Sequence, residues 1–218
     1  MQDLNFEDGV SQALGSLLAS RLALLAGAGL SMAAPSSLPS AYSIAAAAKQ
    51  KYDGQHGTTR APLAEGIEQQ AQFFFDNGEL ETVYLRTLID NHAFAGRPNP
   101  GHIATADLLL VGGIQTAVTT NVDQLIENAG NYLYGQIGSG IDVQHVATLS
   151  PDVRPLLKIH GCRSDPPSMV WAPGQILAPP ISDRIIGNTA WLNIQLLDRD
   201  LLIIGYCVKL HPKLTHLA

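Results

Sequence analysis

Apolar residues recur at helical spacing in some stretches of the chain and form short continuous runs in others. The first pattern predicts helices and the second predicts buried strands. Residues 6–20 carry apolar side chains at helical spacing, which predicts a helix that packs on a sheet. The run 22–26 contains no polar residue and leads into Gly27-Ala28-Gly29. That pattern predicts a buried strand ending in a glycine turn, where the missing side chains give access to unusual backbone angles and to the main chain itself.

The second half of the chain repeats this pattern more regularly. Short apolar runs predict further strands at 113–120, 144–149, 156–160 and 201–206. Helical spacing predicts helices over 102–110 and 122–129. Apolar strands separated by helices are typical of a parallel sheet that is covered on both faces, so the predicted fold class is α/β.

Residues of about 42–100 interrupt the pattern, because they predict helices alone. These helices are expected over 42–48, 63–75 and 80–89, with a polar, mobile stretch at 53–60. We interpret this region as a small helical module inserted into a single domain that covers 1–218. Its carboxylates are expected on solvated helix faces; they are Glu65, Glu68, Glu79 and Glu81.

Composition narrows the classes of partner. The chain has 218 residues and a net charge of −6, so neither nucleic acid nor an anionic membrane is an expected partner. Hydrophobic residues make up 46% and charged residues 15%, which favours a homo-oligomer or a partner protein that covers apolar surface. Cys162 and Cys207 are too few for a four-cysteine zinc site or a disulfide scaffold, which favours a reducing cytoplasm and no metal.

The candidate chemistry lies where the predicted strands end. Ser31 is a natural N-cap, so the glycine turn and the start of a helix would offer N–H groups to a phosphate; a tight turn without a ligand is the alternative. The following strand ends carry Asn121 and Asp123, then His160, then Gly205 and Tyr206. Carboxyl ends of parallel strands share one edge of a sheet, so we expect these groups to meet there.

These motifs resemble the signature blocks of sirtuins, in the order of that family. The matching residues are Gly27-Ala28-Gly29-Leu30-Ser31, Thr119-Thr120-Asn121-Val122-Asp123 and Lys158-Ile159-His160-Gly161. The stretches Pro98-Asn99-Pro100 with His102 and Leu202-Ile203-Ile204-Gly205-Tyr206 are similar to two softer blocks. The resemblance covers roughly residues 20–207.

The resemblance implies a Rossmann-like sheet that binds NAD and breaks the bond between nicotinamide and ribose. His160 and Asn121 would be catalytic. Residues implied to bind NAD are Gly27, Ala28, Gly29, Ser31, Thr120, Asn121, Asp123, Gly205 and Tyr206. Asn121 could instead cap the following helix, Asp123 could be a first-turn carboxylate favoured by the helix dipole, and His102 is expected to bond a neighbouring loop.

Departures from the deacylase pattern decide which sirtuin activity is expected. The paired Cys-x-x-Cys motifs that hold structural zinc are absent, and the loop after the glycine turn, Ser37-Leu38-Pro39-Ser40-Ala41, has neither the usual aromatic residue nor the arginine. Such chains look like the sirtuin-like domains of bacterial anti-phage systems, which hydrolyse NAD to nicotinamide and ADP-ribose. An NAD-dependent lysine deacylase and a non-catalytic sensor of NAD or ADP-ribose are the alternatives. A sirtuin fold would continue beyond Tyr206, so we also interpret the C-terminus as a possible truncation.

Overall fold

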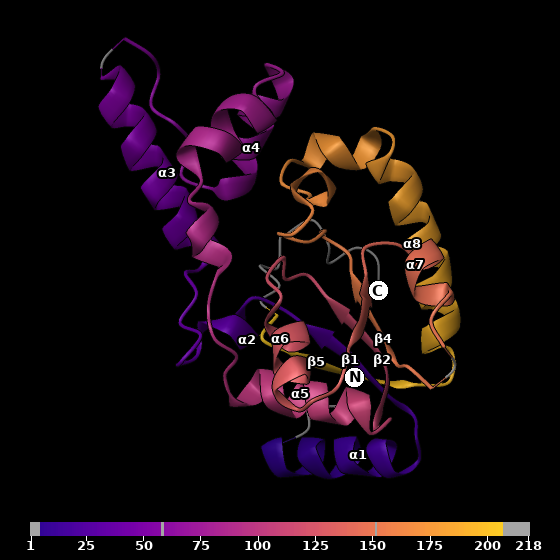
Figure 1. Ribbon diagram of the computed structural model, residues 1–218. Helices are drawn as coiled ribbons and strands as arrows, with labels where there is room; N and C mark the ends of the chain where they lie inside the picture. Colours follow the sequence, from indigo (N-terminus) through magenta and orange to yellow (C-terminus); the bar gives the residue numbers. More distant parts are fainter. Residues whose placement is uncertain (1–4, 58, 151, 207–218) are drawn as a thin grey trace.

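The computed structural model describes residues 5–57, 59–150 and 152–206, and its centre is a parallel β-sheet (Figure 1). The strands are β1 (Leu22–Ala26), β2 (Ile114–Thr119), β3 (Gly138–Gly140), β4 (Pro155–Lys158) and β5 (Asp200–Ile204). They form a five-stranded sheet in the order β3-β4-β2-β1-β5, and every pairing is parallel. The predicted α/β class is therefore confirmed, and the architecture is Rossmann-like.

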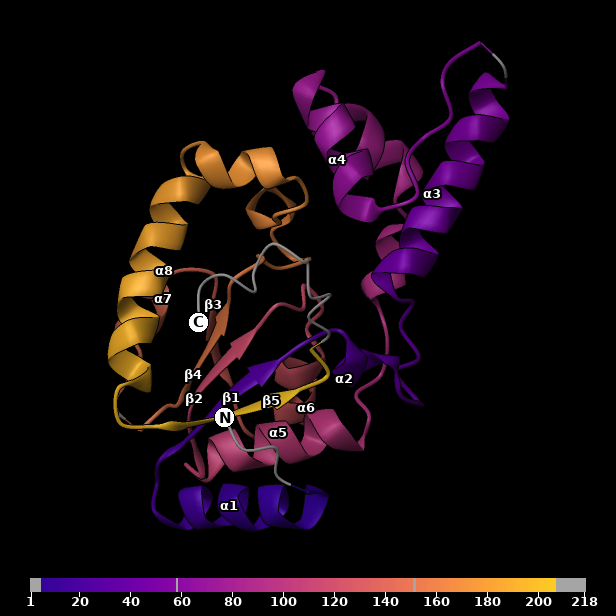
Figure 2. The same ribbon diagram turned by 180° about the vertical axis from the view of Figure 1, so that it is seen from behind.

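Helices cover both faces of this sheet (Figures 1 and 2). One face carries α1 (Phe6–Leu18), α5 (Pro100–Leu110) and α6 (Leu125–Tyr132), and the other carries α7 (Val143–Ala147) and α8 (Ile181–Leu196). Apolar residues of β1, β2 and β4 pack beneath α5 and α6, including Leu24, Ile114 and Leu156. Their removal from water is the main force that holds the strands in place. None of the helices in the described residues is long and apolar enough to cross a membrane.

A group of helices between α2 (Gly29–Met32) and α5 stands beside the sheet (Figure 1). It comprises α3 (Ala41–His56), α4 (Ile67–Asp76), the π-helix η1 (Leu80–Leu88) and the 3-10 turn η2 (Asn91–Phe94). These helices share a second hydrophobic core built around Tyr52, Phe74 and Tyr84. We call residues 41–94 the helical module.

Two predictions about local structure are wrong. The helix predicted over 42–48 is longer than expected: α3 includes residues 53–56 of the polar stretch, where Asp53 pairs with Lys49 at 2.9 Å and also accepts the N–H of Leu63. The stretch 144–149 was expected to be a strand, but residues 143–147 form α7, whose N-cap Asp142 accepts the N–H of His145 at 2.8 Å. The edge strand is β3 instead, and the turns η3 (Pro166–Ser168) and η4 (Pro173–Leu177) follow β4.

Candidate functional site

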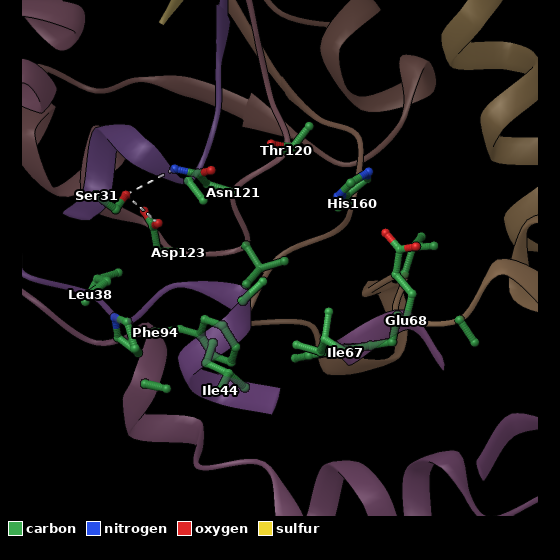
Figure 3. A pocket seen from close by; sticks show the side chains of 18 of the residues that line it. Ser31, Leu38, Ile44, Ile67, Glu68, Phe94, Thr120, Asn121, Asp123 and His160 are labelled. Carbon is green, nitrogen blue, oxygen red and sulfur yellow. Dashed lines mark hydrogen bonds between the residues drawn. The ribbon is translucent and has the colours of Figure 1, made fainter. Parts of the chain in front are cut away.

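A pocket of about 480 Å³ opens at the carboxyl edge of the sheet, between the sheet and the helical module (Figure 3). The loops after β1, β2, β4 and β5 all contribute to its wall. The predicted site residues that line it are Ala28, Ser31, Thr120, Asn121, Asp123, His160 and Tyr206. The two candidate catalytic residues, Asn121 and His160, therefore share one pocket. Gly27, Gly29 and Gly205 are not part of its lining.

Those three glycines pack the end of β5 against the turn after β1. A Cβ on Gly27 would lie 2.6 Å from the Cα of Tyr206, and one on Gly29 would lie 2.9 Å from the Cα of Gly205. Gly205 itself has φ +62°, and a Cβ there would lie 2.3 Å from the N of Leu30. Close approach of two backbone segments, and not an unusual angle at Gly27 or Gly29, is what excludes a side chain from this turn.

The prediction that Ser31 caps a helix is wrong, since the N-cap of α2 is Ala28 and Ser31 lies inside the helix. The N–H groups of the turn are also used within the chain. Gly27 and Gly29 donate to the carbonyls of Ile204 and Gly205 at 2.9 and 2.7 Å. The N–H groups of Leu30 and Ser31 donate to Gly27 and Ala28, each at 3.0 Å. These four residues therefore do not form the expected cradle of free N–H groups.

Ser31 instead connects the polar side chains beneath the pocket. Its hydroxyl donates to Asp123 Oδ2 at 2.8 Å and lies 3.1 Å from both Asn121 Nδ2 and His102 Nε2. His102 Nδ1 accepts the N–H of Asn99, so the proton of the neutral ring is on Nε2, which donates to Ser31. A hydroxyl can donate only one hydrogen bond, and Asp123 accepts the one from Ser31. Asn121 must therefore present its NH₂ group to Ser31.

This arrangement leaves Asn121 Oδ1 without a donor. Asn121 is 8% exposed, its Oδ1 is buried, and no group in the described part of the chain hydrogen-bonds that atom. The oxygen lies on the side of Thr120 and His160, away from Ser31 (Figure 3). An unsatisfied buried acceptor costs about 1–3 kcal/mol, so this one is a strong candidate for contact with a ligand. The alternative that Asn121 caps α6 is wrong, because the N-cap is Gln124.

Both carboxylate oxygens of Asp123 are hydrogen-bonded within the protein. Its Oδ1 accepts the N–H of Leu125 at 3.0 Å, and its Oδ2 accepts the hydroxyl of Ser31. The buried Lys158 donates to the Asp123 carbonyl and forms an ion pair with Glu127 at 2.9 Å. The carboxylate thus holds the start of α6 and the Ser31 hydroxyl, from the position just before the N-cap Gln124 and not from the first turn of the helix.

His160 follows β4 and is a solvent-accessible residue of the pocket wall. Gly161 turns the chain after it with φ +85°, where a Cβ would lie 2.3 Å from the carbonyl oxygen of Ser168. No side chain in the described ranges hydrogen-bonds the ring. Surrounding protein atoms lower the pKa of His160, the charge of Arg184 lowers it further, and the charge of Glu68 opposes both. The ring is therefore neutral at pH 7 and able to accept a proton.

The sequence did not reveal the far wall of the pocket, which the helical module and the segment after β4 supply. Its residues include Ile44, Ile67, Glu68, Phe94, Val170, Trp171 and Ile176. Glu68 is solvent-exposed, as predicted, but the surface it occupies is the wall of the pocket. Nothing in the local spacing distinguishes it from the other carboxylates of the module, because its position depends on how the module docks.

Cys162 is a buried free thiol, whereas Cys207 lies outside the described residues. Within residues 5–57, 59–150 and 152–206, no group of three or more His, Cys, Asp or Glu side chains is placed to hold a metal ion.

Comparison with known proteins does not assign the chain to a family. No protein-family model matches the chain, and no curated protein matches it. The resemblance to sirtuins therefore rests on the sequence motifs alone.

Proposed function

We propose that the protein hydrolyses NAD to nicotinamide and ADP-ribose. The observation that carries the proposal is the pairing, in one pocket, of a buried amide oxygen without a donor, Asn121 Oδ1, and a neutral imidazole, His160. The volume of about 480 Å³ is in the range of about 300–1,000 Å³ typical of small-molecule sites.

The reaction makes limited demands on a protein. The bond between C1′ of the ribose and the pyridinium nitrogen breaks, and its electron pair leaves with neutral nicotinamide. Positive charge then develops on the ribose, and water adds to C1′ while its proton passes to a base. The protein must orient the ribose, exclude other water and accept that proton.

Asn121 and His160 suit these two tasks. Asn121 Oδ1 can accept a hydrogen bond from the attacking water or from a ribose hydroxyl, and the amide is held in that orientation by Ser31. His160 can take the proton, since its lowered pKa keeps the ring neutral. The apolar wall that includes Phe94 and Trp171 would exclude bulk water from the leaving group.

The same wall favours one alternative, the NAD-dependent deacylase. Ile44, Ile67 and Phe94 offer apolar surface on which the aliphatic chain of an acylated lysine could be buried. The two reactions share their first step and differ in what attacks the ribose. A direct assay separates them.

The test incubates the intact protein with NAD alone and with NAD plus an acetyl-lysine peptide, and measures nicotinamide, ADP-ribose and deacetylated peptide. We expect nicotinamide and ADP-ribose without peptide. His160→Ala and Asn121→Ala should each lower kcat by about 10²- to 10⁴-fold. His145→Ala, an exposed histidine of α7 outside the pocket, should match the wild type.

Three results would contradict the proposal. Nicotinamide release that requires the peptide would identify the deacylase. Binding of NAD without any release would identify a sensor. Wild-type rates in His160→Ala would exclude the assigned base.

A further inference from the structure

Two carboxylates line the pocket, and only one of them is hydrogen-bonded within the described part of the chain. Asp123 accepts hydrogen bonds on both oxygens. Glu68 has no hydrogen bond and no ion pair with any residue in the described part of the chain, and the neighbouring wall of Ile67 and Phe94 is apolar. Its carboxylate points toward His160 (Figure 3). A carboxylate that faces a histidine and has no other partner is a candidate to act on that histidine.

The backbone that carries Glu68 is firmly anchored. Glu68 lies in the first turn of α4, and two residues later the buried Gln70 donates to the carbonyl of Ala45 at 2.9 Å. The hydroxyl of Tyr84 donates to Gln70 Oε1 at 2.9 Å. Gln72 on the same helix accepts the N–H of Gly174 at 2.7 Å, which ties α4 to the turn η4. The carboxylate is therefore presented from a fixed helix end.

The segment that carries His160 is attached to the same helices. The N–H of Val170 donates to the carbonyl of His160 at 3.0 Å. The next residue, Trp171, packs edge-on against Phe94 and Tyr84, with ring centroids 5.8 and 6.3 Å apart. Glu68 and His160 thus belong to one packed unit although they come from the module and the sheet.

We propose that Glu68 is a positioning residue for His160, and that its carboxylate stabilises the imidazolium that forms when His160 accepts a proton. The inference rests on the proposed NAD hydrolysis. In that step an O–H bond of the attacking water breaks, a new N–H bond forms on the imidazole, and the oxygen joins C1′ of the ribose. Glu68 gains no proton; its negative charge compensates the charge that His160 acquires.

The electrostatic surroundings of His160 explain why such a group is useful. Desolvation by the surrounding protein atoms and the guanidinium of Arg184 on α8 both disfavour the imidazolium, and Glu68 on α4 favours it. A general base works best when its pKa is close to the operating pH. Glu68 therefore offsets two effects that would otherwise make His160 too weak a base.

The experiment compares Glu68→Gln with the wild type and with Glu81→Gln, a matched charge change at an exposed residue of η1 outside the pocket. The ring of His160 is titrated by NMR in the free protein, and kcat/KM for NAD is measured against pH. In Glu68→Gln we expect a lower pKa of His160, an acid limb of kcat/KM shifted to lower pH, and a kcat reduced by roughly tenfold. Glu81→Gln should change none of these.

An unchanged His160 titration in a folded Glu68→Gln variant would overturn the inference, and so would a shifted titration with an unaltered rate. A wild-type protein that does not release nicotinamide would instead overturn the proposed function. The NMR titration would then still decide whether Glu68 stabilises the imidazolium, because it needs no substrate.

Discussion

Ser31 joins three polar side chains at the pocket, because its hydroxyl donates to Asp123 and accepts from Asn121 and His102. The motif Gly27-Ala28-Gly29-Leu30-Ser31 correctly marks Ser31 as part of the pocket, but its expected role as a helix cap is wrong. Its partners His102 and Asp123 lie 71 and 92 residues away. No local sequence pattern predicts these contacts, because the partners are distant in the chain. The direction of each hydrogen bond follows only from the number of protons in the assembled group.

Ser31→Ala tests this account of the polar group. The substitution leaves Asp123 Oδ2, Asn121 Nδ2 and His102 Nε2 without their common partner, so we expect unfolding in urea to show a loss of about 1–3 kcal/mol. Ser11→Ala, on the exposed side of α1, is the control and should stay within about 0.5 kcal/mol of the wild type. Equal stability of the two variants would mean that the Ser31 contacts contribute nothing.

At the scale of elements, the sequence predicts strands well where apolar runs form them and poorly where neighbours do. β1, β2, β4 and β5 are confirmed within a few residues. β3 consists of Gly138-Ser139-Gly140, which contains no apolar residue, and it is a strand because it pairs with β4. Glycine at 138 leaves room for Val153, whose Cγ1 would lie 2.5 Å from a Cβ at that position. α8 was not predicted, because Ile186 and Ile194 on its exposed side obscure the amphipathic pattern.

The glycine turn after β1 makes a prediction at this scale. In Gly27→Ala the new Cβ would lie 2.6 Å from the Cα of Tyr206 and 2.7 Å from the carbonyl oxygen of Gly205, so the end of β5 must move away. We expect a loss of about 1–3 kcal/mol in the free energy of unfolding, measured by urea denaturation.

The matched control is Gly9→Ala, near the start of α1, where nothing lies within 4 Å of the new Cβ. It should stabilise the protein by about 0.5–1 kcal/mol, because alanine loses less backbone entropy than glycine in a helix. The same effect for both substitutions would show that the turn and β5 do not pack as described.

At the scale of the whole molecule, the parallel topology explains why the site could be anticipated. The N–H of Gly27 donates to Ile204, that of Thr120 to Ala26 and that of Ile159 to Thr119, so the strand ends are tied to one another. A parallel sheet requires this convergence, and the order of the motifs was enough to expect it. The wall supplied by the module could not be expected, because it depends on the packing of two hydrophobic cores against each other.

The central claim is that NAD binds with its nicotinamide ribose between Asn121 and His160. Its most direct test is a crystal structure of the slow variant His160→Ala with saturating NAD. We predict a ribose hydroxyl or a bound water within hydrogen-bond distance of Asn121 Oδ1, with the dinucleotide also contacting Ala28 and Tyr206. NAD bound elsewhere on the protein, or a ribose that leaves Asn121 Oδ1 without a donor, would contradict the account.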